Sequence, residues 1–405
     1  MGARIITWGL TGIVFGALLI LAIHLFPWVD GVVVSALGSA AAHQWAAILT
    51  IVLTAGILTG PIAYAFYVVS GAIGRRIEFQ NSDLTILGMS LTLTVGVLAP
   101  YVLYPVFVMK VLCFALFACA FNLLIGFVGL LSFGHAAYFG AAGYVSGHVA
   151  KVWGWPPELA ILSAIAVAVV LGALFGGIAI RRQGIYFAMI TLALAQMIYF
   201  FALQAKFTGG EDGIQAIPRG HLFGVVDLNQ PLAMYYTVLT IFVAGFLLIY
   251  RTIHSPFGQV LKAIRENEAR AISLGYSVDR YKLVAFVLSA GLAGLAGGTK
   301  SIVFQLASLT DVQWQMSGEV VLMTLLGGIG TVFGPIVGAA LQMAIENFFA
   351  QTGAWVTIIT GGIFVVCVLT FRRGIVGEFT RLFQRRMAGL SPAPRSALPR
   401  VSAAD

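Results

Sequence analysis

Long apolar runs are the feature of this chain that most constrains its fold. Most are close to the length of about 20 residues that a helix needs to cross the hydrocarbon core of a bilayer. Only 9% of the 405 residues are charged, whereas a water-soluble domain carries about 25%. We therefore predict an all-α, polytopic membrane protein with roughly ten or more transmembrane helices. The runs lie at 5–26, 45–73, 84–99, 107–127, 128–150, 158–180, 184–204, 232–250, 281–302 and 354–371.

Basic residues gather in particular loops. If successive spans cross the membrane in alternating directions, these loops all lie on the same side. The basic residues include Arg4, Arg75, Arg76, Arg181, Arg182, the segment 251–282 and the arginines after 371. Because lysine and arginine accumulate in cytoplasmic loops, we predict that both termini lie in the cytoplasm. This distribution accounts for the net charge of +8 without a nucleic-acid partner.

Two glycine-rich segments interrupt the apolar pattern. Residues 318–350 must cross the membrane an even number of times, so two short half-helices or a re-entrant pair fit better than one helix. Unwound backbone at membrane depth survives only inside protein or beside a wet cavity, so the pair predicts a translocation path and an inverted repeat. The alternative is that these glycines only permit close helix packing. They are Gly126, Gly129, Gly134, Gly140 and Gly143 in the first segment, and Gly327, Gly328, Gly330, Gly334 and Gly338 in the second.

Polar residues near the interruptions are candidates for lining the path. The set is Ser132, His135, Tyr138, Gly327, Gly328 and Thr331. For His135 we favour a structural hydrogen bond over a place in the path, and for Glu346 a pair with a basic residue on the inner side. No acidic residue near Ser132 and His135 completes a catalytic triad. The cysteines, Cys113, Cys119 and Cys367, lie in apolar runs without metal-site spacing, so we predict neither a catalytic nor a metal site.

The most informative polar segment, 251–282, predicts a cytoplasmic helix of about 18 residues. Ser255 can cap its start, Pro256 suits the first helical position, and Gly275 can end it in a left-handed conformation. Its charged residues read most simply as a solvated face.

Glu268, Ala269 and Gly275 resemble the EAA loop of ABC importer permeases, although Gly275 comes one position later than in the usual spacing. Three further segments, 122–144, 184–213 and 327–339, resemble the branched-chain amino-acid permease family in the expected order. They read NLLIGFVGLLSFGHAAYFGAAGY, GIYFAMITLALAQ followed by FTGGEDG, and GGIGTVFGPIVGA. The chain is most similar to the LivM-type subunit. The resemblance makes 84–377 the permease core, 1–80 an extra membrane region and 378–405 a cytoplasmic, disordered tail.

This resemblance implies a transport subunit of the bacterial inner membrane for leucine, isoleucine or valine, with no covalent chemistry and no cofactor of its own. ATP would be bound by two cytoplasmic ATPase subunits, alongside a second permease and an extracytoplasmic substrate-binding protein. Glu211 and Asp212 are candidate contacts for the binding protein. The residues expected to couple to the ATPases are Arg265, Glu266, Glu268, Ala269 and Gly275.

Other functions stay open at this point. Within the importer class, the cargo can instead be urea, a short amide or another amino acid. A different class is an ion-coupled secondary carrier working through Glu346 and His135; the polar cytoplasmic helix, which a carrier does not need, argues against it. A membrane-embedded enzyme is disfavoured by the missing catalytic set.

Overall fold

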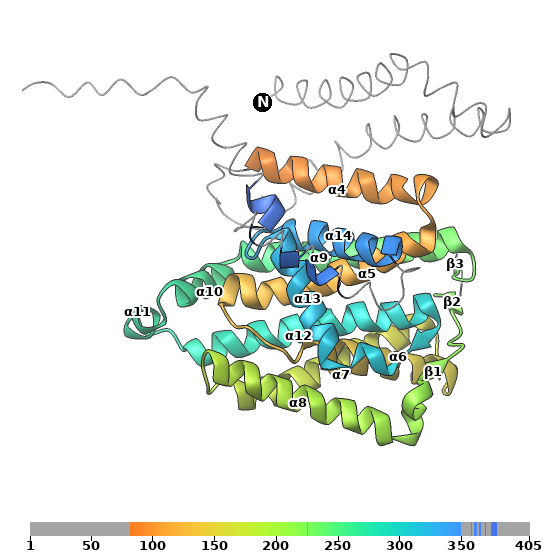
Figure 1. Cartoon of the computed structure of the whole chain (residues 1–405), viewed down its shortest axis with the longest axis horizontal. Coiled ribbons are helices and arrows are strands. Elements are labelled where there is room, and N and C mark those ends of the chain that lie inside the picture. The colour runs from red at the N-terminus through yellow and green to blue at the C-terminus, as the bar shows by residue number, and fades with distance from the viewer. Residues whose placement is uncertain are drawn as a thin grey trace, which may run out of the picture.

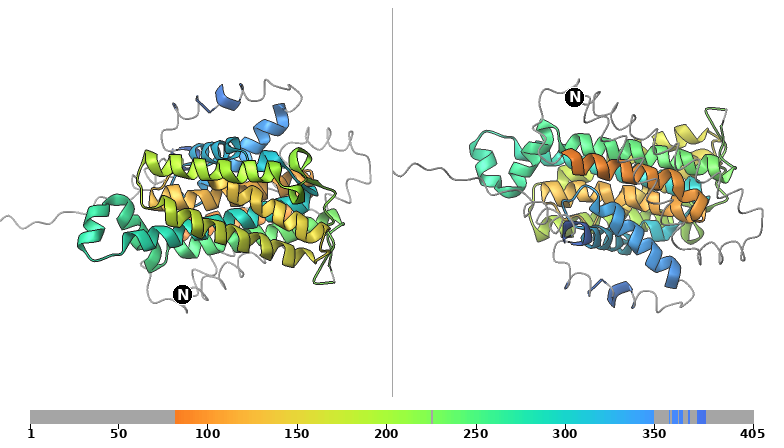
Figure 2. Two further views of the ribbon diagram at one scale, coloured as in Figure 1. Left: turned by 90° about the horizontal axis from the view of Figure 1, so that it is seen from below. Right: turned by 90° about the horizontal axis from the view of Figure 1, so that it is seen from above.

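The computed structural model describes residues 82–349, apart from residue 225, and scattered positions between 358 and 378. The predicted runs at 5–26 and 45–73, the extra region 1–80, most of the run at 354–371 and nearly all of the tail lie outside these residues. The described part is a bundle of helices running along one common direction (Figure 1). Two further views show the same arrangement (Figure 2).

The bundle has two distinct ends. Helices α10 and α11 project from one, and strands β1–β3 lie at the other (Figure 1). We call them the α10–α11 end and the β end. Strand β1 (Ile214–Gln215) pairs antiparallel with β4 (Leu306–Ala307), and β2 (His221–Leu222) pairs antiparallel with β3 (Val226–Asp227). The longer helices are α4 (Ser82–Val102), α5 (Pro105–Asn122), α6 (His135–Lys151), α7 (Pro157–Ala179), α8 (Ile185–Gln204), α9 (Pro231–Ile253), α10 (Pro256–Glu266), α12 (Val278–Phe304), α13 (Trp314–Gly327) and α14 (Gly334–Phe349). Shorter turns are η1 (Leu123–Val128), η2 (Lys206–Thr208), η3 (Gly210–Asp212), α11 (Glu268–Ser273) and η4 (Leu309–Asp311).

Five helices in the described part are long and apolar enough to cross a bilayer. They are α5 with its continuation η1, α7, α8, α9 and α12. Each matches one of the predicted apolar runs, and α5, α7 and α9 begin with a proline in the first turn, where its missing N–H costs nothing. The chain is therefore a multi-pass helical membrane protein.

Helix α5 forms the centre of the bundle. It packs against α9, α12, α13 and α14, and large side chains such as Phe117 and Phe121 are completely buried. A helix that is apolar on every side fits only where protein surrounds it. Helices α9, α12, α13 and α14 are therefore positioned relative to α5.

Small residues let α7 and α12 approach closely. Helix α7 buries a small residue at every fourth position, and its neighbours on α12 are also small. A Cβ on Gly298 would lie 2.6 Å from the Cβ of Ala164, and one on Gly172 would lie 2.6 Å from that of Ala290. Small residues at this spacing drive helix association in membranes, where van der Waals contact replaces the hydrophobic effect.

The same close packing corrects part of the sequence analysis. Gly140 and Gly143, assigned above to the first interruption, lie inside α6. A Cβ on Gly140 would come within 2.8 Å of the backbone nitrogen of Val312. These two glycines therefore serve helix packing, which was the alternative considered for them.

Replacing Gly297 with alanine is expected to destabilise the bundle by about 1–3 kcal/mol or more, because overpacking forces backbone shifts. The new Cβ would overlap the carbonyl of Phe139, and a backbone group cannot rotate away as a side chain can. Thermal unfolding of the purified protein in detergent measures the effect. Gly177→Ala is the matched control, because its Cβ meets nothing within 4 Å. Equal unfolding midpoints for the two variants would contradict this account of α6–α12 packing.

Candidate functional site

The first interruption follows α5. The helix continues as the wider turn η1, which stops at Gly129, a residue with φ of +83°. The chain is then non-helical until α6 begins at His135, and the hydroxyl of Ser132 accepts a hydrogen bond from the Gly134 N–H at 3.2 Å. This non-helical stretch borders a cavity of about 430 Å³, whose other wall is the start of α8 at Gly184.

The second interruption joins α13 to α14. Gly328 and Gly330 have φ of +119° and +75°, which favour glycine. The Thr331 hydroxyl stabilises the turn by donating to the Gly328 carbonyl at 2.7 Å and accepting from the Gly334 N–H at 3.1 Å. The two helices then run antiparallel in close contact, with Gly338 against the Met323 carbonyl. Residues 314–349 thus form a tight helical hairpin.

The two interruptions touch each other at the α10–α11 end. The side-chain amide of Asn122 accepts from the Gly330 N–H and donates to the Thr331 carbonyl, both at 2.9 Å. A Cβ on Gly126 would lie 2.7 Å from the Gly330 nitrogen, so the two backbones approach as closely as glycine allows. Sequence reasoning did not single out Asn122; the signal was an amide side chain inside an otherwise apolar run.

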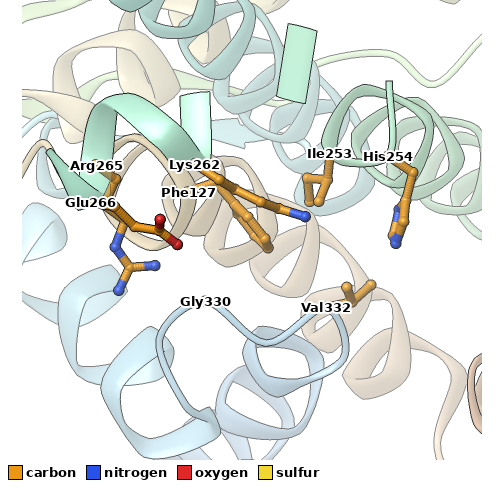
Figure 3. Close-up of a pocket in the computed structure, with 8 residues that line it drawn as sticks. All are labelled: Phe127, Ile253, His254, Lys262, Arg265, Glu266, Gly330 and Val332. Atoms are coloured by element: carbon orange, nitrogen blue, oxygen red, sulfur yellow. The ribbon is translucent and has the colours of Figure 1, made fainter. Parts of the chain in front are cut away.

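Arg265 connects this contact to the polar segment 251–282. From α10 it donates a hydrogen bond through Nη1 to the Gly126 carbonyl in η1. A Cβ on Gly330 would lie 3.2 Å from the same nitrogen. Figure 3 shows the guanidinium pointing towards the α13–α14 turn. One side chain therefore contacts both interruptions.

A cavity of about 610 Å³ opens beside Arg265. Phe127, Lys262, Glu266 and Val332 are among its lining residues (Figure 3). Burial lowers the pKa of His254 at its far side, so the imidazole is neutral at pH 7. The cavity lies where the polar segment meets the bundle, and movement of α10 would change its shape.

The structure corrects the predicted single helix of about 18 residues. The segment folds as α10 and α11, because Asn267 is extended and its side chain caps α11 by accepting from the Arg270 N–H at 2.9 Å. The predicted cap at Ser255 is confirmed, with a 3.2 Å bond from the Gly258 N–H. Gly275 has φ of +86°, as predicted.

Glu268 holds α11 against the bundle. Its carboxylate accepts from Lys282 of α12 at 2.7 Å and from Gln183 before α8 at 2.9 Å. The Lys282 side chain is only 4% exposed, so its buried positive charge needs a negatively charged partner, and Glu268 is that partner. Ala269 and Glu266, in contrast, are exposed and free to meet another protein.

The polar path candidates of the first interruption lie in the core. Ser132, His135 and Tyr138 are completely buried. His135 Nε2 lies 2.9 Å from the Ser289 hydroxyl, which donates to the Ala120 carbonyl at 2.6 Å. The favoured structural hydrogen bond for His135 is therefore present. A role for these three residues in a path stays a prediction.

Glu346 has a basic partner, but at the other end from the one predicted. Its carboxylate lies 3.3 Å from Lys110 Nζ. The prediction placed this pair on the side of the segment 251–282; in fact α14 starts at the α10–α11 end and carries Glu346 away from it. Glu211 and Asp212, the candidate binding-protein contacts, are exposed on η3.

Comparison with known proteins identifies the family. Residues 106–368 match the family model described as "Branched-chain amino acid transport system / permease component". One relative is the high-affinity branched-chain amino acid transport system permease protein LivM of Salmonella typhimurium. The two sequences are 26% identical over 278 residues, which cover 63% of this chain and 65% of that protein. The LivM protein of Escherichia coli gives the same figures. The chain thus spans about two thirds of the length of these relatives.

More distant relatives carry other names. The inner membrane ABC transporter permease protein YjfF of Escherichia coli is 31% identical over 259 residues, 58% of this chain and 73% of that protein. The autoinducer 2 import system permease protein LsrC of Salmonella typhi is 26% identical over 231 residues, 54% of this chain and 63% of that protein. No solved structure matches. The chain belongs to the ABC permease family that contains the permease components of branched-chain amino acid transport systems.

Proposed function

We propose that this chain is one membrane subunit of an ATP-driven importer of leucine, isoleucine and valine. The names of the LivM relatives support the cargo, and the multi-pass bundle supports a role as the translocation unit. The chain itself carries out no covalent chemistry and binds no cofactor, because ATP is bound by partner subunits. LsrC, named for autoinducer 2, is the reason to keep other cargo, such as urea or short amides, as the alternative.

Four kinds of partner complete the proposed importer: a second, related permease, two ATPase subunits, an extracytoplasmic substrate-binding protein and the lipid bilayer. The α10–α11 end faces the cytoplasm and the ATPases, and the β end, with Glu211 and Asp212, faces the binding protein. The basic residues of 251–282 support this orientation through the positive-inside rule.

One observation supports the coupling mechanism: the segment proposed to meet the ATPases is hydrogen-bonded to the first interruption and lies in contact with the second. When nucleotide binding moves α10 and α11, Arg265 transmits the movement to η1 through Gly126. Asn122 ties η1 to the α13–α14 turn, so the two interruptions move together. The proposed path, bordered by these interruptions and including Gly327, Gly328 and Thr331, then changes its access from one side to the other.

Ala269→Trp is expected to block the ATPase dock and to lower ATP-driven uptake. Ala269 is exposed on α11, so a bulky side chain there disturbs a partner and not this chain's own packing. Co-purification of the ATPase subunits and leucine uptake by proteoliposomes containing the whole complex measure the two effects. Normal assembly and normal uptake by this variant would count against the docking surface.

The whole-complex assay also tests the importer class. Uptake is expected only with ATP, both permeases, the ATPases and the binding protein present. Uptake by this chain alone, driven by an ion gradient, would instead favour the secondary carrier.

A further inference from the structure

The cavity at the α10–α11 end is lined by charges of both signs and by apolar side chains. Its volume of about 610 Å³ lies within the range of about 300–1,000 Å³ that is typical of small-molecule sites. Lys262 and Glu266 of α10 supply charges, and Phe127, Ile253 and Val332 supply an apolar wall. The wall comes from η1, from the end of α9 and from the turn between α13 and α14, so segments far apart in the sequence enclose one space.

The two charged groups of α10 have no partner. Lys262 and Glu266 are one helical turn apart and so lie on the same face of α10. Neither side chain forms a hydrogen bond or an ion pair with any residue that the structure describes. Lys262 Nζ lies 5.9 Å from the centre of the Phe127 ring, and in Figure 3 this ring lies between Nζ and the Glu266 carboxylate. The cavity is therefore bordered by a separated pair of opposite charges.

The other titratable groups of the lining leave this pair free. Arg265 already donates to the Gly126 carbonyl, and His254 is neutral at pH 7. Burial lowers the pKa of Lys262. The side chain is only half-buried, however, and an ordinary lysine has a pKa of about 10.4, so Lys262 is a cation at pH 7. An ammonium group that has lost part of its water is stabilised by a carboxylate beside it.

These features together fit one chemical class of ligand. An α-amino acid carries its carboxylate and its ammonium group on one small unit, so it can meet a lysine and a glutamate that lie one helical turn apart. A branched aliphatic side chain gains free energy against the apolar wall, where it is removed from water. A simple anion such as phosphate fits less well, because it would face the like charge of Glu266.

We propose that this cavity binds a free aliphatic amino acid, with its carboxylate on Lys262, its ammonium group on Glu266 and its side chain on the apolar wall. The inference rests on the proposed import function, in which this end faces the cytoplasm and the cargo has this chemistry. The ligand then spans α10, η1 and the α13–α14 turn, so it opposes the movement of α10 that coupling requires. Cargo that accumulates in the cytoplasm therefore slows its own import.

Direct binding to the assembled complex, without ATP or binding protein, tests the class of ligand. Three compounds with the same branched carbon chain serve as probes: leucine, 4-methylpentanoate, which lacks the ammonium group, and 3-methylbutylamine, which lacks the carboxylate. Each of the two analogues is expected to bind the wild type about tenfold more weakly than leucine, since each loses a charge-assisted hydrogen bond. An analogue that binds as tightly as leucine overturns the proposed contact with the group it lacks.

Lys262→Met tests whether the carboxylate is held in this cavity. Methionine keeps an apolar stem but removes the charge, so the variant should bind leucine about tenfold more weakly than the wild type and 3-methylbutylamine no more weakly. Lys206→Met, which changes an exposed lysine on η2 at the other end of α8, is the control and should bind leucine as the wild type does. Unchanged leucine binding by Lys262→Met means that leucine binds elsewhere. Thermal unfolding of each complex separates lost binding from lost folding, and Lys262→Gln replaces Lys262→Met if the latter unfolds early.

Uptake by proteoliposomes tests the effect on import. ATP is enclosed inside, and the binding protein delivers labelled leucine from outside. Unlabelled leucine enclosed with the ATP should slow uptake by the wild type, and Lys262→Met should need about tenfold more of it for the same slowing, each relative to its own rate without enclosed leucine. Equal sensitivity of the two complexes overturns the feedback role. The wild-type rate without enclosed leucine tests the import function by itself, so the failure of either proposal can be recognised separately.

Discussion

Arg265→Ala is expected to lower the number of leucine molecules imported per ATP hydrolysed by about tenfold, within the range of typical coupling free energies. The variant loses the bond to the Gly126 carbonyl and the contact at Gly330, and with them the link between α10 and the two interruptions. ATP hydrolysis should continue, because Glu266 and Ala269, which are also exposed at the proposed ATPase contact, are unchanged. Uptake and phosphate release measured on the same proteoliposomes give the ratio.

Two further variants make the result specific. Arg265→Lys should be intermediate, since an ammonium group can keep the bond to Gly126 but lacks the planar fork of a guanidinium. Arg270→Ala removes an exposed arginine whose side chain has no hydrogen bond or ion pair to the described residues, and should couple normally. A wild-type ratio for Arg265→Ala would show that the movement reaches the bundle by another route.

The spanning helices could be predicted because their causes are local. An apolar run of the right length must be a helix in a bilayer, and the prolines at 105, 157 and 231 mark the points where three of them start. The cap at Ser255 and the left-handed Gly275 were predictable for the same reason. The division between α10 and α11 was also visible: Asn267 followed by Glu268 is a favourable cap and first-turn pair.

The contacts that make up the site could not be predicted, because they join distant parts of the chain. Asn122 and Gly330 are 208 residues apart, and only the folded hairpin α13–α14 brings them together. Glu346 was predicted to pair with a basic residue at the wrong end, since the direction of α14 depends on where the preceding turn lies; its partner, Lys110, is 236 residues away. The sequence identifies the polar side chains that need partners inside an apolar bundle. Which residues become those partners is decided by the packing of α5 against the α13–α14 hairpin.

Glu268→Arg is expected to have the largest effect on stability and assembly. Lys282 would lose its carboxylate while buried and gain a second cation beside it, and breaking a buried pair in this way costs about 3–5 kcal/mol. The actual cost lies towards the lower end, because the Glu268 side chain is 28% exposed and partly solvated. Helix α11 should detach from α12 and from Gln183, so the docking surface for the ATPases is lost together with stability.

Reversing both charges separates this pair from other effects of the substitution. The double variant Glu268→Lys with Lys282→Glu restores an ion pair between α11 and α12 and should recover part of the thermal stability and of the ATPase co-purification. Each single variant should lack both. If the double variant is no better than the sum of the single ones, the two residues are not coupled. In that case Glu268 acts through a partner protein, as the resemblance to the EAA loop first implied, and not by holding α11 in place.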